Sequence, residues 1–171
     1  MASIRTSLFY LLIISVAFLF GGCGLYSFQG GKLSPGLETV SIERFENNAS
    51  LVVPTLAVDL TEALKDKFQS QSNLKLRDYD GDLQFSGSIS GYSVSPVAIQ
   101  GDETAAQNRL SVSVRVVYDN SQYPEQSWQN TFTQFQDFDS NLNLSDVEAE
   151  LLLTIIDQLT TDIFNKVLSN W

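Results

Sequence analysis

The sequence predicts an α+β domain, with two helices packed on one face of a mainly antiparallel sheet of four to five strands. Two segments, one near residue 60 and one at the C-terminal end, carry apolar residues at the spacing of an amphipathic helix. Between them, apolar and polar residues alternate along several segments, which is typical of antiparallel strands with one buried and one wet face. A hydrophobic fraction of 43% and a charged fraction of 18% are those of a folded domain.

Residues 1–22 are predicted to be a lipoprotein signal peptide. They contain a positive residue, Arg5, and a nearly unbroken apolar run over residues 8–20 that is short for a membrane span. Cys23, the single cysteine of the chain, follows directly and can carry lipid. The segment 19–23 resembles a bacterial lipobox, which implies a diacylglyceryl thioether on Cys23 and stable anchoring by several acyl chains. The alternative is an ordinary secretory signal with an incidental cysteine.

Residues 23–37 are predicted to form the lipidated cysteine and a flexible tether, because they contain several glycines and Pro35. A single α+β domain is expected over residues 38–171. Without the signal, nine basic residues remain against twenty acidic ones, a net charge of about −11. Such a surface repels nucleic acid, so no nucleic-acid partner is expected.

The first part of the domain is predicted to be strand, helix, strand. Val40 and Ile42 alternate with polar neighbours, which indicates a short strand. A helix of about four turns is expected to begin near Pro54. A second short strand is expected over residues 74–77. The helix is indicated by four apolar residues at a spacing of four, namely Leu56, Leu60, Leu64 and Phe68.

Three longer strands are predicted next. Apolar residues alternate from Leu83 onwards, and the phase of the alternation changes near Gly91, which indicates a β-bulge. The clearest alternation covers residues 110–118. After a hairpin loop over residues 119–126, a partner strand is expected from Trp128.

A long helix is predicted at the C-terminal end, over residues 145–169. Ser145 and Glu148 have the spacing of a capping box, in which each side chain satisfies a backbone donor at the start of a helix. Acidic residues near its beginning and Lys166 near its end match the helix dipole. A wide apolar stripe along this helix is expected to cover one face of the sheet.

The residue types argue against catalysis. The chain has no histidine, and its one cysteine is assigned to lipid, so the usual nucleophiles and general bases are missing. No cofactor or metal is expected. Asp78, Asp80 and Asp82 cluster at a turn, where aspartate is favoured by local hydrogen bonds. The alternatives for this cluster are a calcium site or a pair of glycosidase acids.

Two further groups of side chains are candidates for binding. Lys75 and Arg77 project from the same side of a short strand and are weak candidates for contact with an anionic ligand such as a lipid headgroup; a solvated strand face is the alternative. Phe132, Phe135 and Phe138 could form a platform for glycans. Because they occupy both odd and even positions, they cannot all share one face, so core or interface packing is favoured.

Three stretches together resemble a known family. They are Cys23-Gly24-Leu25-Tyr26-Ser27-Phe28, Asn108-Arg109-Leu110, and the ending from Ile163-Phe164-Asn165-Lys166 to Asn170-Trp171. Through them the whole mature chain resembles the LptE family of lipopolysaccharide-assembly lipoproteins, in the form found in Bacteroidota-like bacteria. The resemblance implies two helices against a four-stranded sheet and a non-enzymatic role as the plug of the large β-barrel LptD, with help in barrel assembly.

The same resemblance implies the partners and the location. The expected partners are an LptD-type barrel, lipopolysaccharide on its way to the outer leaflet, and the membrane through the lipid anchor. No acidic run follows Cys23, which by resemblance to lipoprotein sorting signals favours the outer membrane, with the domain facing the periplasm or the barrel lumen. The competing hypotheses are a periplasmic ligand- or glycan-binding lipoprotein and a hydrolase that uses carboxylates alone.

Overall fold

The computed structural model describes residues 33–51, 53–97 and 106–169. The two predicted helices and the predicted strands all form. In chain order the elements are β1 (Thr39–Ile42), β2 (Glu46–Asn47), α2 (Leu56–Gln71), β3 (Lys75–Arg77), β4 (Leu83–Val97), β5 (Gln107–Asn120), the 3₁₀ turn η1 (Pro124–Gln126), β6 (Trp128–Asp139) and α3 (Leu144–Leu168).

The strands form one mixed sheet in the order β3-β1-β4-β5-β6, with β2 beside β4. The long pairs β4–β5 and β5–β6 are antiparallel, whereas β1 runs parallel to both β3 and β4. The predicted fold class is therefore confirmed, with six strands and a parallel part added. The parallel pairing of β1 and β3 arises because α2 carries the chain back over the sheet between them, as a crossover helix does.

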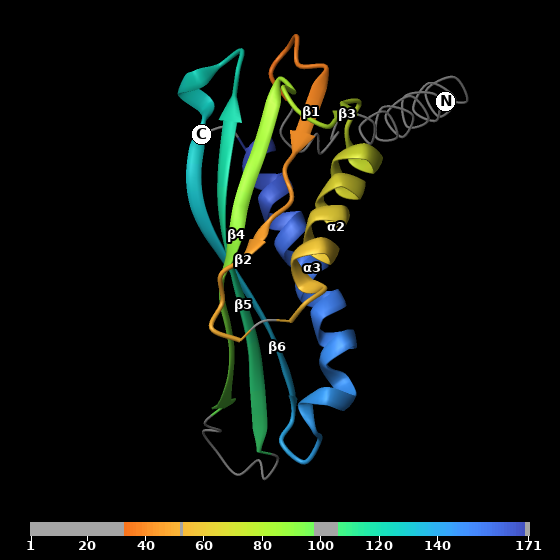
Figure 1. Ribbon diagram of the computed structural model, residues 1–171, viewed down its shortest axis with the longest axis vertical. Coiled ribbons are helices and arrows are strands. Elements are labelled where there is room, and N and C mark those ends of the chain that lie inside the picture. The colour runs from red at the N-terminus through yellow and green to blue at the C-terminus, as the bar shows by residue number, and fades with distance from the viewer. Residues whose placement is uncertain (1–32, 52, 98–105, 170–171) are drawn as a thin grey trace, which may run out of the picture. The chain divides into compact units, whose positions relative to one another are not determined.

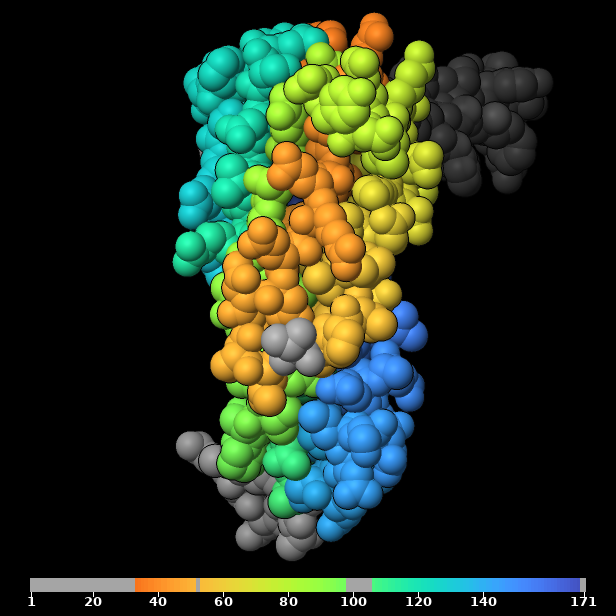
Figure 2. All heavy atoms as spheres, in the orientation of Figure 1, coloured from red at the N-terminus to blue at the C-terminus, as the bar shows by residue number. Residues whose placement is uncertain are grey.

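Both helices pack on the same face of the sheet (Figure 1). α2 packs against β1, β2 and β3, and α3 packs against β5 and β6. Figure 2 shows residues 33–51, in orange, running down between the green atoms of β4 and the yellow atoms of α2, so this segment closes one side of the layer between sheet and helix.

The core lies between the helices and the inward-facing residues of the strands. Along β5 every second side chain is buried, as the alternation predicts. Phe68 of α2 lies at the centre of an aromatic group, with ring centroids 4.9 Å from Phe85 and 5.1 Å from Phe164. The buried hydrophobic strand residues are Val40, Ile42, Leu83, Phe85, Ile89, Tyr92, Leu110, Val112, Val114, Val116, Tyr118 and Phe138.

Two glycines of β4 have separate roles. The pairing register between β4 and β5 shifts between Ile89 and Gly91, which confirms the predicted bulge. Gly87 allows a close approach, because a Cβ atom there would lie 2.7 Å from Cε1 of Phe45 and 2.2 Å from the carbonyl oxygen of Arg115. Phe45, which is buried, can therefore pack directly over the strand.

The predicted capping box is wrong. α3 begins at Leu144 with Asn143 as its N-cap, and the side chain of Asn143 makes no capping hydrogen bond. Ser145 lies inside the helix, and Glu148 instead accepts a hydrogen bond from the hydroxyl of Tyr92 on β4. The contact with the sheet decides the use of Glu148, which local spacing does not reveal.

Across the described ranges, neither α2 nor α3 combines the length and apolar content needed to span a bilayer.

Candidate interaction surface

In the described part of the chain, neither helix covers the second face of β4, β5 and β6, which we call the open sheet face. Its residues alternate along the strands with the buried ones and are exposed or half-buried. The open sheet face consists of Gln84, Ser86, Ser88, Ser93, Ser95, Arg109, Ser111, Ser113, Arg115, Val117, Asp119, Gln129, Thr131, Thr133, Phe135 and Asp137.

The open sheet face is rich in hydroxyl and amide groups and poor in net charge. Neighbouring hydroxyls join across strands, as where Ser113 Oγ and Thr133 Oγ1 lie 2.8 Å apart. Such a surface can exchange many hydrogen bonds with a polar partner. Within the described ranges, no three histidine, cysteine or acidic side chains come close enough together to hold a metal ion.

One charged cluster stands on the open sheet face. The guanidinium of Arg109 donates two hydrogen bonds to the carboxylate of Asp137, at 2.7 and 2.9 Å, and its Cζ lies 3.7 Å from the ring centroid of Phe135. The hydrogen bonds with Asp137 raise the pKa of Arg109, and those with Arg109 lower the pKa of Asp137. Because the two charges neutralise each other, this part of the face offers the aromatic residue Phe135, which is 43% exposed, rather than a free charge.

Asp82, in the predicted acidic turn, is a structural carboxylate. Its Oδ2 accepts hydrogen bonds from the backbone N–H groups of Glu38 and Thr39, both at 2.9 Å, and from the hydroxyl of Thr39 at 2.8 Å. Its Oδ1 accepts one from the amide of Gln122 at 3.0 Å. The hydrogen bond from Glu38 and the others lower the pKa of Asp82 to about 2. The turn thus ties β1 to the β5–β6 hairpin, whereas Asp78 and Asp80 are exposed.

Residues 33–37, which fall in the segment expected as a tether, pack on the domain. Leu33 and Leu37 are partly buried against the core. The hydroxyl of Tyr123 donates to the carbonyl of Pro35 at 2.9 Å, and the amide of Gln122 donates to the carbonyl of Gly36 at 3.0 Å. The hairpin loop between β5 and β6 therefore holds the point at which the chain enters the domain.

The two weak ligand candidates, Lys75 and Arg77, lie on β3 and are exposed. β3 forms one edge of the sheet, paired with β1 alone. Contact with an anionic ligand stays a prediction, and so does lipidation of Cys23, which lies outside the described residues.

The three phenylalanines of β6 divide between two faces, as predicted from their positions. Phe138 is buried and Phe132 packs against the core, whereas Phe135 is on the open sheet face. They therefore do not form a common platform. Sequence reasoning missed the cluster of Arg109, Phe135 and Asp137, and the only available signal was that Arg109 and Asp137 occupy outward positions on two expected neighbouring strands.

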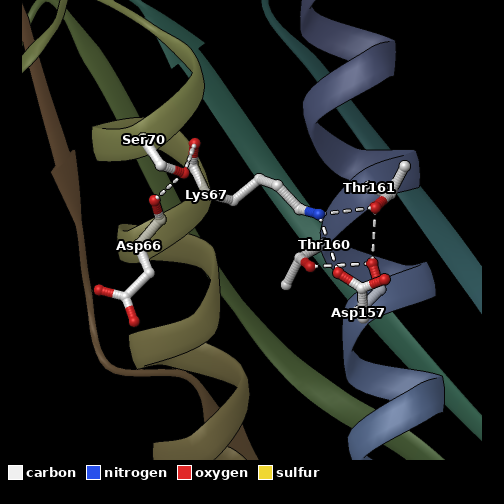
Figure 3. Close-up of polar contacts among 6 residues, drawn as sticks. All are labelled: Asp66, Lys67, Ser70, Asp157, Thr160 and Thr161. Carbon is white, nitrogen blue, oxygen red and sulfur yellow. Dashed lines mark hydrogen bonds and ion pairs between the residues drawn. The ribbon is translucent and has the colours of Figure 1, made fainter.

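A shallow groove lies on the outer side of the two helices. Lys67 extends from α2 towards α3, where its Nζ lies 2.9 Å from Oδ1 of Asp157 and 2.8 Å from Oγ1 of Thr161 (Figure 3). The groove beside this contact has a volume of about 310 Å³ and is lined in part by Leu153. Because Lys67 is already paired, the groove does not present a free positive charge, and the open sheet face remains the larger candidate surface.

The comparisons with known proteins agree with this fold. The family model LptE, described as lipopolysaccharide-assembly, matches residues 37–167. No match was found among curated proteins. A minor lipoprotein from Acinetobacter baumannii is similar with a TM-score of 0.51 and 16% identity, over 78% of this chain and 94% of that one.

Two further solved structures are similar. A protein from Xanthomonas campestris has a TM-score of 0.51 and 10% identity, over 82% of this chain and 91% of that one. Rare lipoprotein B from Shewanella oneidensis has a TM-score of 0.48 and 10% identity, over 77% of this chain and 91% of that one. At these identities, the two structures with a TM-score of 0.51 show a shared fold and no more.

Proposed function

Because this chain belongs to the LptE family of lipopolysaccharide-assembly proteins, we propose that it is a non-enzymatic outer-membrane lipoprotein that plugs an LptD-type β-barrel and helps to assemble it. In this role it supports insertion of lipopolysaccharide into the outer leaflet. Family membership supports the broader role in lipopolysaccharide transport and outer-membrane assembly. The single observation that favours a plug is the open sheet face, which is polar, nearly neutral and left uncovered by both helices in the described residues.

The physical fit is between two polar surfaces. The lumen of a transmembrane β-barrel is lined by polar side chains, because the strands alternate apolar outward and polar inward. Serine and threonine side chains on the open sheet face can approach such a wall closely and exchange hydrogen bonds with it, either directly or through water. The charged pair of Arg109 and Asp137 costs less to cover than two unpaired charges would, because each charge already has its partner.

The proposed anchor is lipid on Cys23, after removal of residues 1–22. Several acyl chains on one residue give stable membrane binding, whereas one chain gives only marginal binding. Replacement of Cys23 with serine is expected to release the protein from the outer membrane into the soluble fraction. If the serine variant fractionates with the membrane as wild type does and the wild-type protein carries no lipid by mass spectrometry, the anchor assignment is wrong.

The barrel partner is tested by purification through a C-terminal tag in mild detergent. Wild type is expected to carry a large β-barrel of the LptD type at equal stoichiometry. Ser111→Glu places a charge in the middle of the open sheet face and is expected to reduce the recovered barrel at least tenfold, because a buried unpaired carboxylate is costly. Thr154→Glu, the same kind of change on an exposed site of α3, is the matched control.

The two variants separate the possible outcomes. Loss of the barrel with Ser111→Glu and retention with Thr154→Glu supports contact through the open sheet face. If wild type purifies without any barrel from a membrane that contains one, the plug role is wrong, and a periplasmic ligand-binding lipoprotein becomes the leading alternative.

A further inference from the structure

The two edges of the sheet differ sharply in how they are protected. The edge strand β3 has three residues, two of which are Lys75 and Arg77. Charged residues on a short strand are a common means of preventing an edge from pairing with another chain. The opposite edge strand, β6, has twelve residues and no lysine, arginine, proline or glycine. Its register with β5 is continuous, without a bulge that would twist the edge away.

The direction of the backbone groups of β6 follows from two hydrogen bonds at the strand ends. The N–H of Ser121, just after β5, donates to the backbone carbonyl of Asp82, just before β4, at 2.9 Å. Because backbone groups alternate in direction along a strand, the odd-numbered residues of β5 point their N–H and C=O groups towards β4. The N–H of Ser140, just after β6, donates to the backbone carbonyl of Ala106, just before β5, at 3.0 Å. The even-numbered residues of β5 and β6 therefore form the backbone hydrogen bonds between these two strands. Both observations give the same result. The N–H and C=O groups of odd-numbered β6 residues point away from the sheet.

Six residues of β6 are odd-numbered, but the carbonyl of Asp139 already accepts a hydrogen bond from the N–H of Leu142 at 3.0 Å. The other five, at positions 129, 131, 133, 135 and 137, therefore present an alternating row of backbone donors and acceptors. In the described ranges no strand lies beyond β6 to receive them. The side chains of Gln129, Thr131 and Thr133 are exposed, so neighbouring atoms do not cover this stretch. Over twelve residues the edge is about 40 Å long at 3.4 Å per residue.

α3 leaves this edge free, because its contacts use the other residues of the strand. The amide of Gln134 donates to Asp162 at 2.6 Å, and that of Gln136 donates to Gln158 at 3.3 Å. Both glutamines are even-numbered and lie on the helix-facing side of β6. α3 thus stabilises β6 against the sheet without using the outward backbone groups.

From this geometry we propose that the free edge of β6 pairs with an extended segment of a different polypeptide, which adds a further strand to the sheet. A regular row of N–H and C=O groups at alternate residues is complementary to another strand. A second copy of this chain does not suit the edge, because each copy without residues 1–22 carries a net charge of about −11 and repels the other. This inference goes beyond the plug role and does not require that the barrel supply the strand.

The expected segment has a defined chemistry. On the side of the sheet that faces the helices, residues of the added segment would lie beside Phe132 and Phe138 of β6, so apolar side chains are favoured there. Residues on its other side continue the open sheet face, so serine, threonine and glutamine are favoured. Near Asp139, which is exposed, a basic residue is favoured over an acidic one. A strand inside a closed barrel wall is already paired on both sides, so the segment lies outside such a wall.

The decisive test removes one outward N–H group. Thr133→Pro deletes it, and an edge strand accepts proline where the N–H faces solvent. Thr133→Val is the matched control, since it also loses the hydroxyl but keeps the N–H. Full-length variants are purified from native membranes, and the recovery of every stoichiometric partner is compared. We expect Thr133→Pro to lose one partner at least tenfold while Thr133→Val retains it, with both variants showing wild-type circular dichroism.

Hydrogen exchange of the wild-type protein provides a measurement that needs no variant. Amides at the odd positions from 129 to 137 are expected to exchange at least tenfold more slowly in the purified complex than in the protein separated from its partners. Amides at even positions are expected to be protected in both. Equal exchange at the odd positions in the two samples overturns the proposal, whether or not Thr133→Pro folds.

Light scattering that shows a dimer of this chain alone, with the odd positions protected, overturns the choice of a different polypeptide. If Ser111→Glu loses the barrel while Thr133→Pro retains every partner, the plug role stands and the edge proposal fails. If Thr133→Pro loses a partner but keeps the barrel, and the odd amides are protected in the wild-type complex, the edge proposal stands and its strand comes from elsewhere.

Discussion

The carboxylate of Asp82, in the turn before β4, binds Thr39 at the start of β1 through both the backbone N–H, at 2.9 Å, and the hydroxyl, at 2.8 Å. The same hydroxyl accepts a hydrogen bond from the N–H of Asp82, also at 2.9 Å. This reciprocal contact fixes β1 beside β4, where Val40 is the register partner of Leu83. A single residue of the acidic turn thus links the start of β1 to the start of β4.

Asp82→Asn is expected to reduce the free energy of unfolding by about 1 kcal/mol at neutral pH, because hydrogen bonds to a charged acceptor are replaced by weaker ones. The folded-state pKa of Asp82 is lowered from 3.8 to about 2. The stability it contributes is therefore present above about pH 4 and is lost as the pH falls from there towards 2. Urea unfolding of both proteins across this range checks the effect.

Asp78→Asn is the control for this pH dependence, since Asp78 is exposed in the same turn. This variant is expected to keep the wild-type loss of stability in acid. If Asp82→Asn instead follows the wild-type curve between pH 4 and pH 2, the hydrogen bonds to Thr39 and Glu38 do not contribute in solution.

The two glycines of β4 are expected to respond differently to the same substitution. Gly87→Ala places Cβ 2.2 Å from a carbonyl oxygen that is held in the β4–β5 ladder, and 2.7 Å from Phe45. We expect a loss of about 1–3 kcal/mol, as for overpacked sites. Gly91→Ala places Cβ 3.3 Å from Cβ of Ser113 at the bulge, so we expect a change within about 0.5 kcal/mol. Denaturant unfolding of the pair measures the difference, and equal effects would contradict the close packing of Phe45 on β4.

The hydrogen bond from Tyr92 to Glu148 is expected to stabilise the contact between β4 and α3. Tyr92→Phe removes the donor and is expected to cost about 1–2 kcal/mol, whereas Glu148→Gln keeps an acceptor and is expected to cost less. Burial, together with Glu148, raises the pKa of Tyr92. Stability from the neutral phenol is therefore complete below pH 10 and is lost as the pH rises further.

Denaturant unfolding ranks these two variants, and an ultraviolet absorbance titration follows ionisation of the tyrosines. Burial raises the pKa of Tyr118 as well as that of Tyr92, so the titration of wild type is expected to contain one more late-ionising tyrosine than that of Tyr92→Phe. If the two titrations differ only in amplitude in the ordinary range, Tyr92 is not held as the structure describes.

Much of the fold could be predicted from the sequence because its determinants are local. The spacing of Leu56, Leu60 and Leu64 depends only on the helical repeat, and the alternation along residues 110–118 depends only on the strand repeat. The same holds for the bulge at Gly91 and for the division of the β6 phenylalanines between two faces. These features need no knowledge of which segment lies next to which.

The candidate surface could be predicted only in part. Alternation along β4 and β5 indicates that one face is polar, but it does not show that both helices leave that face uncovered. The pairing of Arg109 with Asp137 depends on the register between β5 and β6. The capping box at Ser145 and Glu148 failed for a related reason, since Tyr92 on a distant strand accounts for the role of Glu148.

The sequence by itself determined the class of the fold, the two amphipathic helices, the strand segments and the absence of histidine chemistry. Only the tertiary structure decided the strand order, the parallel pairing of β1, the hydrogen bonds of Asp82 to the start of β1 and the position of β6 at an open edge. The reason is physical, because a periodic pattern shows only which side of a segment is buried. Sheet edges, strand registers and long-range hydrogen bonds depend on which segments become neighbours, and that choice is set by packing of the whole core.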